Sequence, residues 1–360
     1  MLRARARWRG APAIEVSWEE GFARTRVDDP CVRSSYLEAV SGIGVVLNPR
    51  SRKNLRDPRA AGRLARALGD HGVLREASSI DELYRIAEDF KQLRIDVLGI
   101  SGGDGTNHVT ITGFLNVYDG MPLPKLAFLR GGTMNTVANS VGVKRDKPEG
   151  VLGRVIRSYA ARASRPLADV ERHVMRIGPL GRPSEANYGF LFGTGVVRGF
   201  LAEYYAGGDP SPLVAAKTLS RAVGSSLVRG EMIRRMAEPF RGTVSLPDGS
   251  VWRERDYLAV AAGTIDQMGL NFRPFYRFGE RAGHFHMLGI HATPMQFVRD
   301  MPRIWRARPM RPGKTYEAVV PSAVVRSHDS VMRYMIDGDL HEVRGEVEIG
   351  IGPKVKLLVV

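Results

Sequence analysis

A glycine-rich loop in the first third of the chain has the residue types that a phosphate-binding site requires. Ser101-Gly102-Gly103-Asp104-Gly105-Thr106 follows the apolar run Ile95–Ile100, which is short enough to be a buried parallel strand, and precedes a helix predicted over Thr106–Tyr118. Glycines let an anion approach the main chain without meeting a Cβ. The helix N-terminus adds unpaired N–H groups and a partial positive charge. The pattern predicts a phosphate site, and the alternative is a tight turn with Asp104 as a solvated cap.

The carboxylate of Asp104 is a candidate for indirect metal binding. A carboxylate and a phosphate are both anionic, so we expect no direct contact between them. Magnesium is held in proteins by few carboxylates and keeps several waters. We therefore predict that Asp104 holds a Mg²⁺ ion, shared with the phosphates, through a metal-bound water.

A second glycine loop follows the next predicted strand. Lys125–Leu129 reads as that strand, Arg130-Gly131-Gly132-Thr133-Met134-Asn135 as its loop, and Thr136–Val141 as the start of another helix. Consecutive strand–loop–helix units place their loops at the carboxyl edge of one sheet, where open α/β sheets bind ligands. The two loops are therefore predicted to lie side by side.

An acidic turn near the C-terminus completes the candidate chemistry. Asp337-Gly338-Asp339 follows a strand predicted over Met332–Ile336 and presents two carboxylates. Phosphoryl transfer to an alcohol needs positioned phosphates, a metal that neutralises charge, and a carboxylate near the attacking hydroxyl. The alternative is a plain β-hairpin turn, for which Asp-Gly is a favoured pair.

Together with Asn48-Pro49, which ends the predicted strand Ile43–Leu47, these motifs resemble the diacylglycerol kinase catalytic family. That family includes bacterial lipid kinases, sphingosine kinases and ceramide kinases. It has an Asn-Pro turn, a Gly-Gly-Asp-Gly-Thr loop, a Gly-Thr-x-Asn loop and a late Asp-Gly-Glu, in the order found here. The resemblance covers roughly residues 43 to 360, and the shared order is more specific than any single motif.

The resemblance implies ATP and Mg²⁺ as cofactors and assigns functions to individual residues. It makes Asp339 the general base, with Asp104 and Asp337 as the other candidate catalytic carboxylates. The residues implied to bind the nucleotide are Asn48, Pro49, Arg50, Ser51, Ser101, Gly102, Gly103, Asp104, Gly105, Thr106, Asn107, Gly132, Thr133 and Asn135.

This chain departs from the family pattern at several positions. Asp339 is one methylene shorter than the usual glutamate, and Ser51-Arg52 lacks the glycine that many members have in the first loop. Asn107-His108-Val109 stands where many members have Leu-Asn-Glu, so either a metal contact is weakened or His108 takes over part of the site. Arg281-Ala282-Gly283 replaces an Asp-Asp-Gly that is linked to a structural magnesium in some relatives. No structural metal is therefore predicted there, and an inactive relative stays open.

The remaining pattern predicts an α/β fold with two domains. A Rossmann-like three-layer α/β domain is expected over residues 41–165, and a β-rich sandwich domain that binds the lipid over 166–335. Residues 336–360 are expected to return towards the first domain, with the active site in the cleft between the domains. Helices are predicted over Arg59–Leu68, Ile80–Phe90, Gly150–Ala163, Leu213–Arg235 and Met295–Ala307. Residues 1–40 form a poorly defined extension.

The composition favours a peripheral protein with an anionic partner. The formal net charge is +15 and the sequence pI is about 10.2, which fits either nucleic acid or an acidic membrane surface. Given the kinase motifs we expect a lipid at an anionic membrane and no nucleic acid. The single cysteine, Cys31, fits a reducing compartment, and no signal peptide or transmembrane helix is readable. We expect a cytoplasmic protein on the inner face of the membrane, and leave open whether it forms a homodimer.

Three classes of function fit these patterns. The first is an ATP-dependent lipid kinase that acts on a diacylglycerol, sphingoid base or ceramide. The second is a soluble kinase such as NAD kinase, which shares the Gly-Gly-Asp-Gly-Thr loop, and the third is a non-catalytic nucleotide-binding relative. The Asn-Pro turn, the Gly-Thr-x-Asn loop and the acidic turn favour the first class. They do not specify which lipid is phosphorylated.

Overall fold

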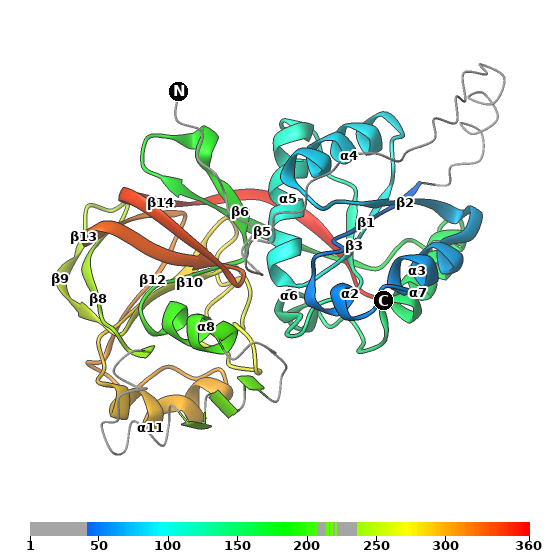
Figure 1. Cartoon of the computed structure of the whole chain (residues 1–360). Coiled ribbons are helices and arrows are strands. Elements are labelled where there is room, and N and C mark those ends of the chain that lie inside the picture. Colours follow the sequence, from blue (N-terminus) through cyan, green and yellow to red (C-terminus); the bar gives the residue numbers. More distant parts are fainter. Residues whose placement is uncertain (1–41, 207–213, 216, 219, 222–235) are drawn as a thin grey trace, which may run out of the picture.

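The computed structural model describes residues 42–206, 214–215, 217–218, 220–221 and 236–360 (Figure 1). The predicted extension, residues 1–40, and most of the helix predicted over Leu213–Arg235 lie outside the described residues. The described part has a mixed α/β fold with a central sheet and a β-rich C-terminal region, which confirms the predicted fold class.

The first domain is built on four parallel strands: β1 (Ile43–Leu47), β2 (Gly72–Glu76), β3 (Val97–Ser101) and β4 (Lys125–Phe128). β1 pairs with β2 and β3, and β3 pairs with β4. Every residue of β1 and β3 is buried, because helices cover both faces of the sheet. This burial explains why the two strands read as unbroken apolar runs.

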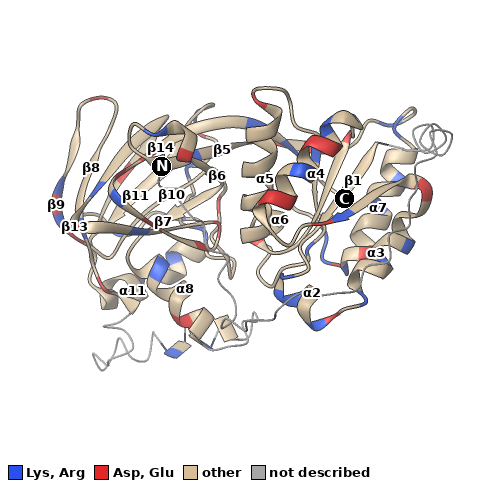
Figure 2. Cartoon of the chain, turned by 45° about the horizontal axis from the view of Figure 1, so that its top comes forward, with Lys and Arg blue, Asp and Glu red and all other residues tan. Residues whose placement is uncertain are grey.

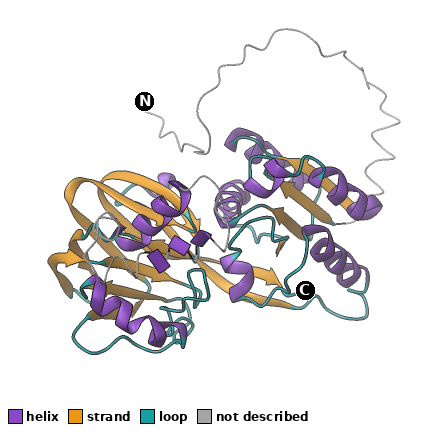
Figure 3. Cartoon of the chain, turned by 60° about the horizontal axis from the view of Figure 1, so that its bottom comes forward, coloured by secondary structure: helices purple, strands orange, loops and turns teal. Residues whose placement is uncertain are grey.

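Helices flank these strands on both sides, whereas the second domain is mostly strands (Figure 3). The helices of the first domain are α2 (Arg52–Arg56), α3 (Ala60–Leu68), α4 (Ile80–Gln92), α5 (Asp104–Tyr118), α6 (Thr136–Ser140) and α7 (Pro148–Ala160). Ser79 caps α4, since its Oγ accepts from the N–H of Glu82 at 3.2 Å. α5 is buried along most of its length because it lies between the parallel strands, α4 and the second domain.

The second domain pairs its strands mainly antiparallel. Its strands are β5 (Asp169–Pro179), β6 (Asn187–Gly189), β7 (Leu191–Gly193), β8 (Phe240–Ser245), β9 (Val251–Tyr257), β10 (Ala259–Gly263), β11 (Phe285–Ile290), β12 (Thr315–Val320) and β13 (Ser322–Ile336). Two longer helices accompany them, α8 (Val196–Ala206) and α11 (Pro294–Trp305). A separate apolar core, with Phe192, Trp252, Tyr257 and Phe285 among its members, fills this domain.

One strand connects the two domains. β14 (Asp339–Leu358) pairs antiparallel with β13 and β5 and then, through Leu357 and Leu126, in parallel with β4. Figure 1 shows it, in red, running from the second domain into the first. The described strands therefore form a single sheet in the order β12-β11-β10-β7-β13-β14-β4-β3-β1-β2, with β5, β6, β8 and β9 branching from it.

Several boundaries differ from those predicted. α5 begins at Asp104 and not at Thr106, so the glycine loop is already part of the first helical turn. The residues that follow the acidic turn form one long strand, β14 (Asp339–Leu358). Gly195 precedes helix α8 and Gly199 lies within it. Both glycines lie where a Cβ would overlap the backbone carbonyls of other segments.

Candidate active site

Three loops meet at the carboxyl edge of the parallel strands. They follow β1 at Asn48, β3 at Gly102 and β4 at Arg130, and parallel pairing brings the ends of these strands together. The side-chain amide of Asn48 donates to Thr106 Oγ1 at 3.1 Å, and its main-chain N–H donates to the Ser101 carbonyl at 3.1 Å. The Asn-Pro turn is thereby joined to the first glycine loop.

The two glycine loops pack backbone against backbone. A Cβ on Gly132 would overlap the Cα of Gly103, and a Cβ on Gly131 would lie 2.7 Å from the main-chain nitrogen of Gly102. Because these contacts are to main chain, no rotamer change relieves them. The glycines are therefore required by the fit between the loops, in addition to any access they give to a phosphate.

The second glycine loop is fixed by side chains of its own. Asn135 has a left-handed backbone (φ 49°), and its side chain bonds both the N–H and the carbonyl of Gly132, at 3.2 and 2.7 Å. Arg130 is also left-handed (φ 56°) and donates to the Val143 carbonyl and to Asn139 Oδ1. Its own carbonyl accepts from Lys53 Nζ at 3.3 Å.

Asp104 connects the two loops through the start of helix α6. Its carboxylate accepts from the main-chain N–H groups of Thr136 at 3.0 Å and Val137 at 3.4 Å, the first two residues of that helix. Burial raises the pKa of Asp104, and these two bonds oppose the rise by stabilising the anion. Asp104, which was predicted to assist a metal, therefore stabilises the N-terminus of α6 in the structure.

The acidic turn is a two-residue β-hairpin loop between β13 and β14. Ile336 pairs with Asp339, and the intervening Asp337 and Gly338 both have positive φ, 45° and 93°, as a type I′ turn requires. The carboxylate of Asp337 is buried and accepts from the N–H groups of Phe190 and Leu191 at 2.8–3.1 Å. Burial raises its pKa well above the usual range. Asp337 therefore ties the turn to the adjacent strands.

Asp339, the next residue after this turn, reaches across to the first domain. A Cβ on Gly105 would overlap its carboxylate, so the carboxylate lies directly against the first turn of α5. Burial raises the pKa of Asp339, and the imidazole of His108 has the opposite influence. The two acidic residues of the turn thus differ: one holds the turn in place and the other faces the glycine loop.

A contact between helices α2 and α8 closes the same side of the site. The guanidinium of Arg52 lies 4.7 Å from the ring centroid of Tyr205, and the Tyr205 hydroxyl donates to the Gly338 carbonyl at 3.0 Å. Tyr205 thus touches both the first loop and the acidic turn. Figure 2 shows the basic residues of α2 at this end of the first domain.

Several buried polar atoms around the loops have no protein partner. They are Ser51 Oγ, Arg52 Nη1, Ser101 Oγ and Asn107 Oδ1. Buried polar groups are normally hydrogen-bonded, so such a set indicates a polar ligand or water. Three of them belong to residues predicted to bind the nucleotide, and a phosphate would suit the unpartnered guanidinium nitrogen. This part of the site fits a nucleoside triphosphate.

Magnesium fits less completely. Among the described residues no group of three His, Cys, Asp or Glu side chains is placed to hold a metal. A phosphate-bound Mg²⁺ needs only one or two protein carboxylates. Asp104 and Asp339 both lie beside the loops, and the hydrogen bonds of Asp104 to α6 leave it contact with a metal through water, as predicted.

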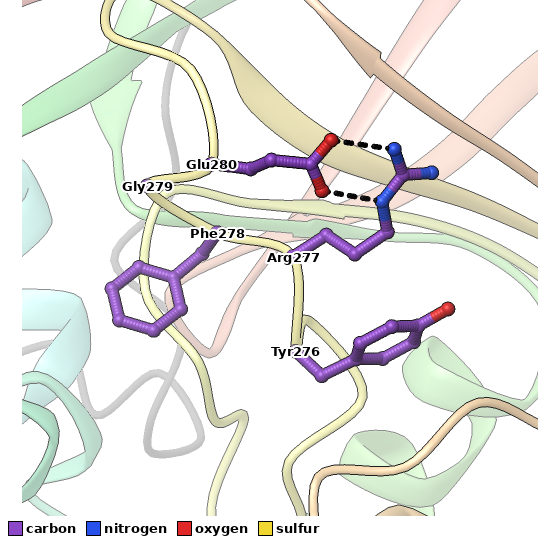
Figure 4. Close-up of a pocket in the computed structure, with 5 residues that line it drawn as sticks. All are labelled: Tyr276, Arg277, Phe278, Gly279 and Glu280. Carbon is purple, nitrogen blue, oxygen red and sulfur yellow. Dashed lines mark hydrogen bonds and ion pairs between the residues drawn. The ribbon is translucent and has the colours of Figure 1, made fainter.

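A hollow in the second domain lies on the loop that follows β10. Tyr276, Phe278 and Gly279 line it, together with Arg277 and Glu280, which form a two-bond ion pair (Figure 4). Each charge is neutralised by the other, and both side chains are partly exposed. The Tyr276 hydroxyl likewise donates to Glu317, so the polar side chains that line the hollow are already paired.

Sequence reasoning missed two side chains of this site. Tyr205 was missed because α8 was not predicted, and its contacts come from residues far away in the chain. His341 was missed because one histidine in a polar strand gives no signal of its own. The alternation of β14 could have identified it, since residues 339 and 341 share one face of a strand.

Comparison with known proteins agrees with this geometry. Residues 42–165 match the family model of the diacylglycerol kinase catalytic domain. No curated protein sequence matches the chain. A structure of a diacylglycerol kinase from Bacillus anthracis str. Sterne superposes with a TM-score of 0.57 at 14% identity, covering 89% of this chain and 97% of that chain.

A second structure, of a protein from the same strain assigned as a diacylglycerol kinase, gives a TM-score of 0.60 at 15% identity with the same coverage. At such identities the superpositions show a shared fold over most of the chain. The family model adds a match of sequence pattern over the first domain. The resemblance to the diacylglycerol kinase catalytic family is thereby confirmed for residues 42–165.

Proposed function

We propose that this protein transfers the γ-phosphoryl group of ATP to the hydroxyl group of a lipid of the diacylglycerol, sphingoid base or ceramide class. The observation that carries the proposal is the contact between Asp339 and Gly105. It sets a carboxylate from the second domain against the helix that follows the first glycine loop. If the glycine loop binds phosphate and Asp339 is the base, this contact brings them together, as phosphoryl transfer to an alcohol requires.

The first domain would hold the nucleotide mainly through its main chain. The first turn of α5 has N–H groups without partners inside the helix, and its N-terminus favours negative charge. Ser51, Arg52, Ser101 and Asn107 supply the unpartnered polar atoms beside it. A bound Mg²⁺ would neutralise charge on the phosphates, with Asp104 in reach through water.

The second domain would supply the base. Asp339 in its ionised form takes the proton of the lipid hydroxyl while that oxygen forms a bond to the γ-phosphorus. The bond from the γ-phosphorus to the bridging oxygen breaks, and ADP leaves. Because burial raises the pKa of Asp339, the carboxylate is a stronger base than a solvated one. Asp104 and Asp337 act as positioning residues, since their oxygens bind main-chain N–H groups.

The lipid would be reached at an anionic membrane surface on the cytoplasmic side. No described helix is long and apolar enough to cross a bilayer. Helix α11 ends in an exposed tryptophan, Trp305, and the segment around it includes Arg299, Arg303, Arg306 and Arg308. Basic residues beside an exposed aromatic ring are typical of surfaces that bind anionic lipids.

Radiolabelled ATP tests the proposal directly. The protein is incubated with a panel of lipids in mixed micelles, and the panel includes a diacylglycerol, a sphingoid base, a ceramide and an isoprenoid alcohol. A parallel reaction contains NAD as the acceptor. We expect label in one lipid class, lost in Asp339→Asn. Label in NAD, or no labelled acceptor in any reaction, would overturn the proposal.

A further inference from the structure

Two histidines lie beside Asp339, and nothing in the proposed transfer uses them. Gly105 and His108 are three residues apart on α5 and so share one side of that helix. Asp339 and His341 are two residues apart on β14 and share one face of the strand. Since Asp339 lies against Gly105, the two histidines meet one turn further along. Their ring centroids are 5.4 Å apart in an edge-to-face arrangement.

The protonation of the His108 ring follows from its surroundings. Its Nδ1 lies 2.8 Å from the main-chain carbonyl of Tyr188, which also accepts from Thr112 Oγ1 at 3.3 Å. A carbonyl oxygen only accepts hydrogen bonds, so Nδ1 carries the proton. Burial lowers the pKa of His108, and the negative charge of Asp339 opposes this effect. A neutral ring with its proton on Nδ1 leaves Nε2 as a bare acceptor.

That acceptor is buried and has no partner. His108 is fully buried, and no protein group lies within hydrogen-bonding distance of its Nε2. Asp339 and His341, both on β14, interact with this ring, whereas the carboxylate of Asp104, one turn earlier on α5, is bound to α6. Burial lowers the pKa of His341 to about 3, so it too is neutral at pH 7. An orphaned acceptor of this kind costs stability unless it is used in another state of the site.

We propose that His108 is the positioning residue of the base: once Asp339 has taken a proton, its carboxyl group turns towards His108 and donates its acid O–H to Nε2. This rests on the proposed function. In the ionised state the carboxylate and Nε2 are both acceptors and lie beyond hydrogen-bonding distance, so no bond joins them. When the hydroxyl proton of the lipid reaches Asp339, one of the two acceptors becomes a donor. The new hydrogen bond stabilises the state in which the lipid oxygen has lost its proton.

The kinetic test compares two substitutions with a matched control. His108→Phe keeps a ring and removes the acceptor, whereas His108→Gln restores an acceptor. Partners that orient metal ligands contribute on the order of 10- to 100-fold, and we take the same order for a residue that orients a base. We expect His108→Phe to lower kcat by that factor with the KM for ATP unchanged, and His108→Gln to recover part of the loss. The control is His173→Gln, because His173 Nδ1 makes the same 2.8 Å contact to a carbonyl, that of Gly352.

A second readout needs no turnover. With ¹⁵N-labelled histidine, NMR should find the wild-type His108 ring neutral and protonated on Nδ1. Its apparent pKa should fall in Asp339→Asn, because the substitution removes the neighbouring negative charge. Unchanged titration of His108, or wild-type kcat in His108→Phe, would overturn the inference. If the titration changes and no lipid is phosphorylated, the coupling of the two residues stands and the proposed function fails.

Discussion

The two sides of the candidate site use different parts of the chain. On the side of the first domain the glycine loops touch main chain to main chain, and their side chains serve mostly to fix the loops. On the side of the second domain the carboxylate of Asp339 faces the loops, and behind it His341 of β14 meets His108 of α5 in the first domain. One side is suited to holding phosphates, and the other to moving a proton.

This difference explains which departures from the family pattern matter. A site built from main chain tolerates changes of side chain as long as the glycines at the loop contacts stay. Ser51-Arg52, where many family members have a glycine, lies outside those contacts, at the start of the short helix α2. A site built from one side chain depends on its identity and reach. Substitution should therefore change chemistry at the shortened Asp339 and at the unusual His108, which lies on α5 beside that carboxylate.

The largest effect is expected from removing the base. Asp339→Asn should lower kcat by on the order of 10²- to 10⁴-fold, the usual contribution of a general base. Asp339→Glu should retain activity, since it restores the residue usual in the family. Steady-state rates with lipid and ATP measure both. If Asp339→Asn keeps most of its turnover, the base lies elsewhere.

A methyl group added to the second glycine loop, on the nucleotide side of the site, should weaken ATP binding. The Cβ of Gly132→Ala would meet the backbone of Gly103, and overpacking of this kind typically costs about 1–3 kcal/mol. We expect ATP affinity to fall by about tenfold or more with a lower melting temperature. Gly62→Ala in α3 is the control, because its Cβ meets only the end of the Arg66 side chain. That substitution should leave ATP affinity unchanged, and an equal loss in both would make the effect non-specific.

Stability should depend on pH in a way that reveals the buried acid. The folded-state pKa of Asp339 is raised, so between its unfolded value, about 3.9, and the folded value the native state binds more protons than the unfolded state. The contribution of Asp339 to stability is full below that window and is lost as pH rises through it. An asparagine at position 339 stays neutral at every pH. The melting temperature of Asp339→Asn should therefore rise relative to that of wild type as pH increases through the same window. A difference that does not change with pH would contradict the raised pKa.

The smallest effect is expected at the contact between α2 and α8. Tyr205→Phe keeps the ring beneath Arg52 and removes the hydroxyl that donates to Gly338. A hydrogen bond contributes about 0.5–1.5 kcal/mol, so kcat/KM for the lipid should fall by roughly 2- to 10-fold. Tyr84→Phe is matched to it, since the Tyr84 hydroxyl accepts from Asn116 on the outside of the first domain. Equal rates in the two variants would show that Tyr205 does not hold the turn.

Local pattern was enough to predict most elements of the first domain. β1 matches its predicted range, and α3, α4 and α7 lie within a few residues of theirs, because buried strands and amphipathic helices leave periodic signals. The short half-buried strand β2 and the five-residue helix α2 leave no such signal. Neither was predicted.

The candidate site depended on contacts that no local pattern encodes. The sequence indicated the loops and the acidic turn but not that Asp339 would lie against Gly105, since that contact arises only when β14 returns along the sheet. The sequence left two interpretations of Asp337-Gly338-Asp339, a plain β-hairpin turn or a source of catalytic carboxylates. The structure shows a hairpin whose geometry presents the second carboxylate to the first domain.

One crossed measurement tests the central claim that one side of the site binds the nucleotide and the other moves the proton. ATP dissociation constants, determined calorimetrically, and turnover with lipid are compared in wild type, Asp339→Asn and Gly132→Ala. We predict that Asp339→Asn keeps the ATP dissociation constant within about twofold while turnover falls on the order of 10²-fold or more. Gly132→Ala should raise the dissociation constant. A loss of ATP affinity in Asp339→Asn as large as its loss of turnover would contradict the division.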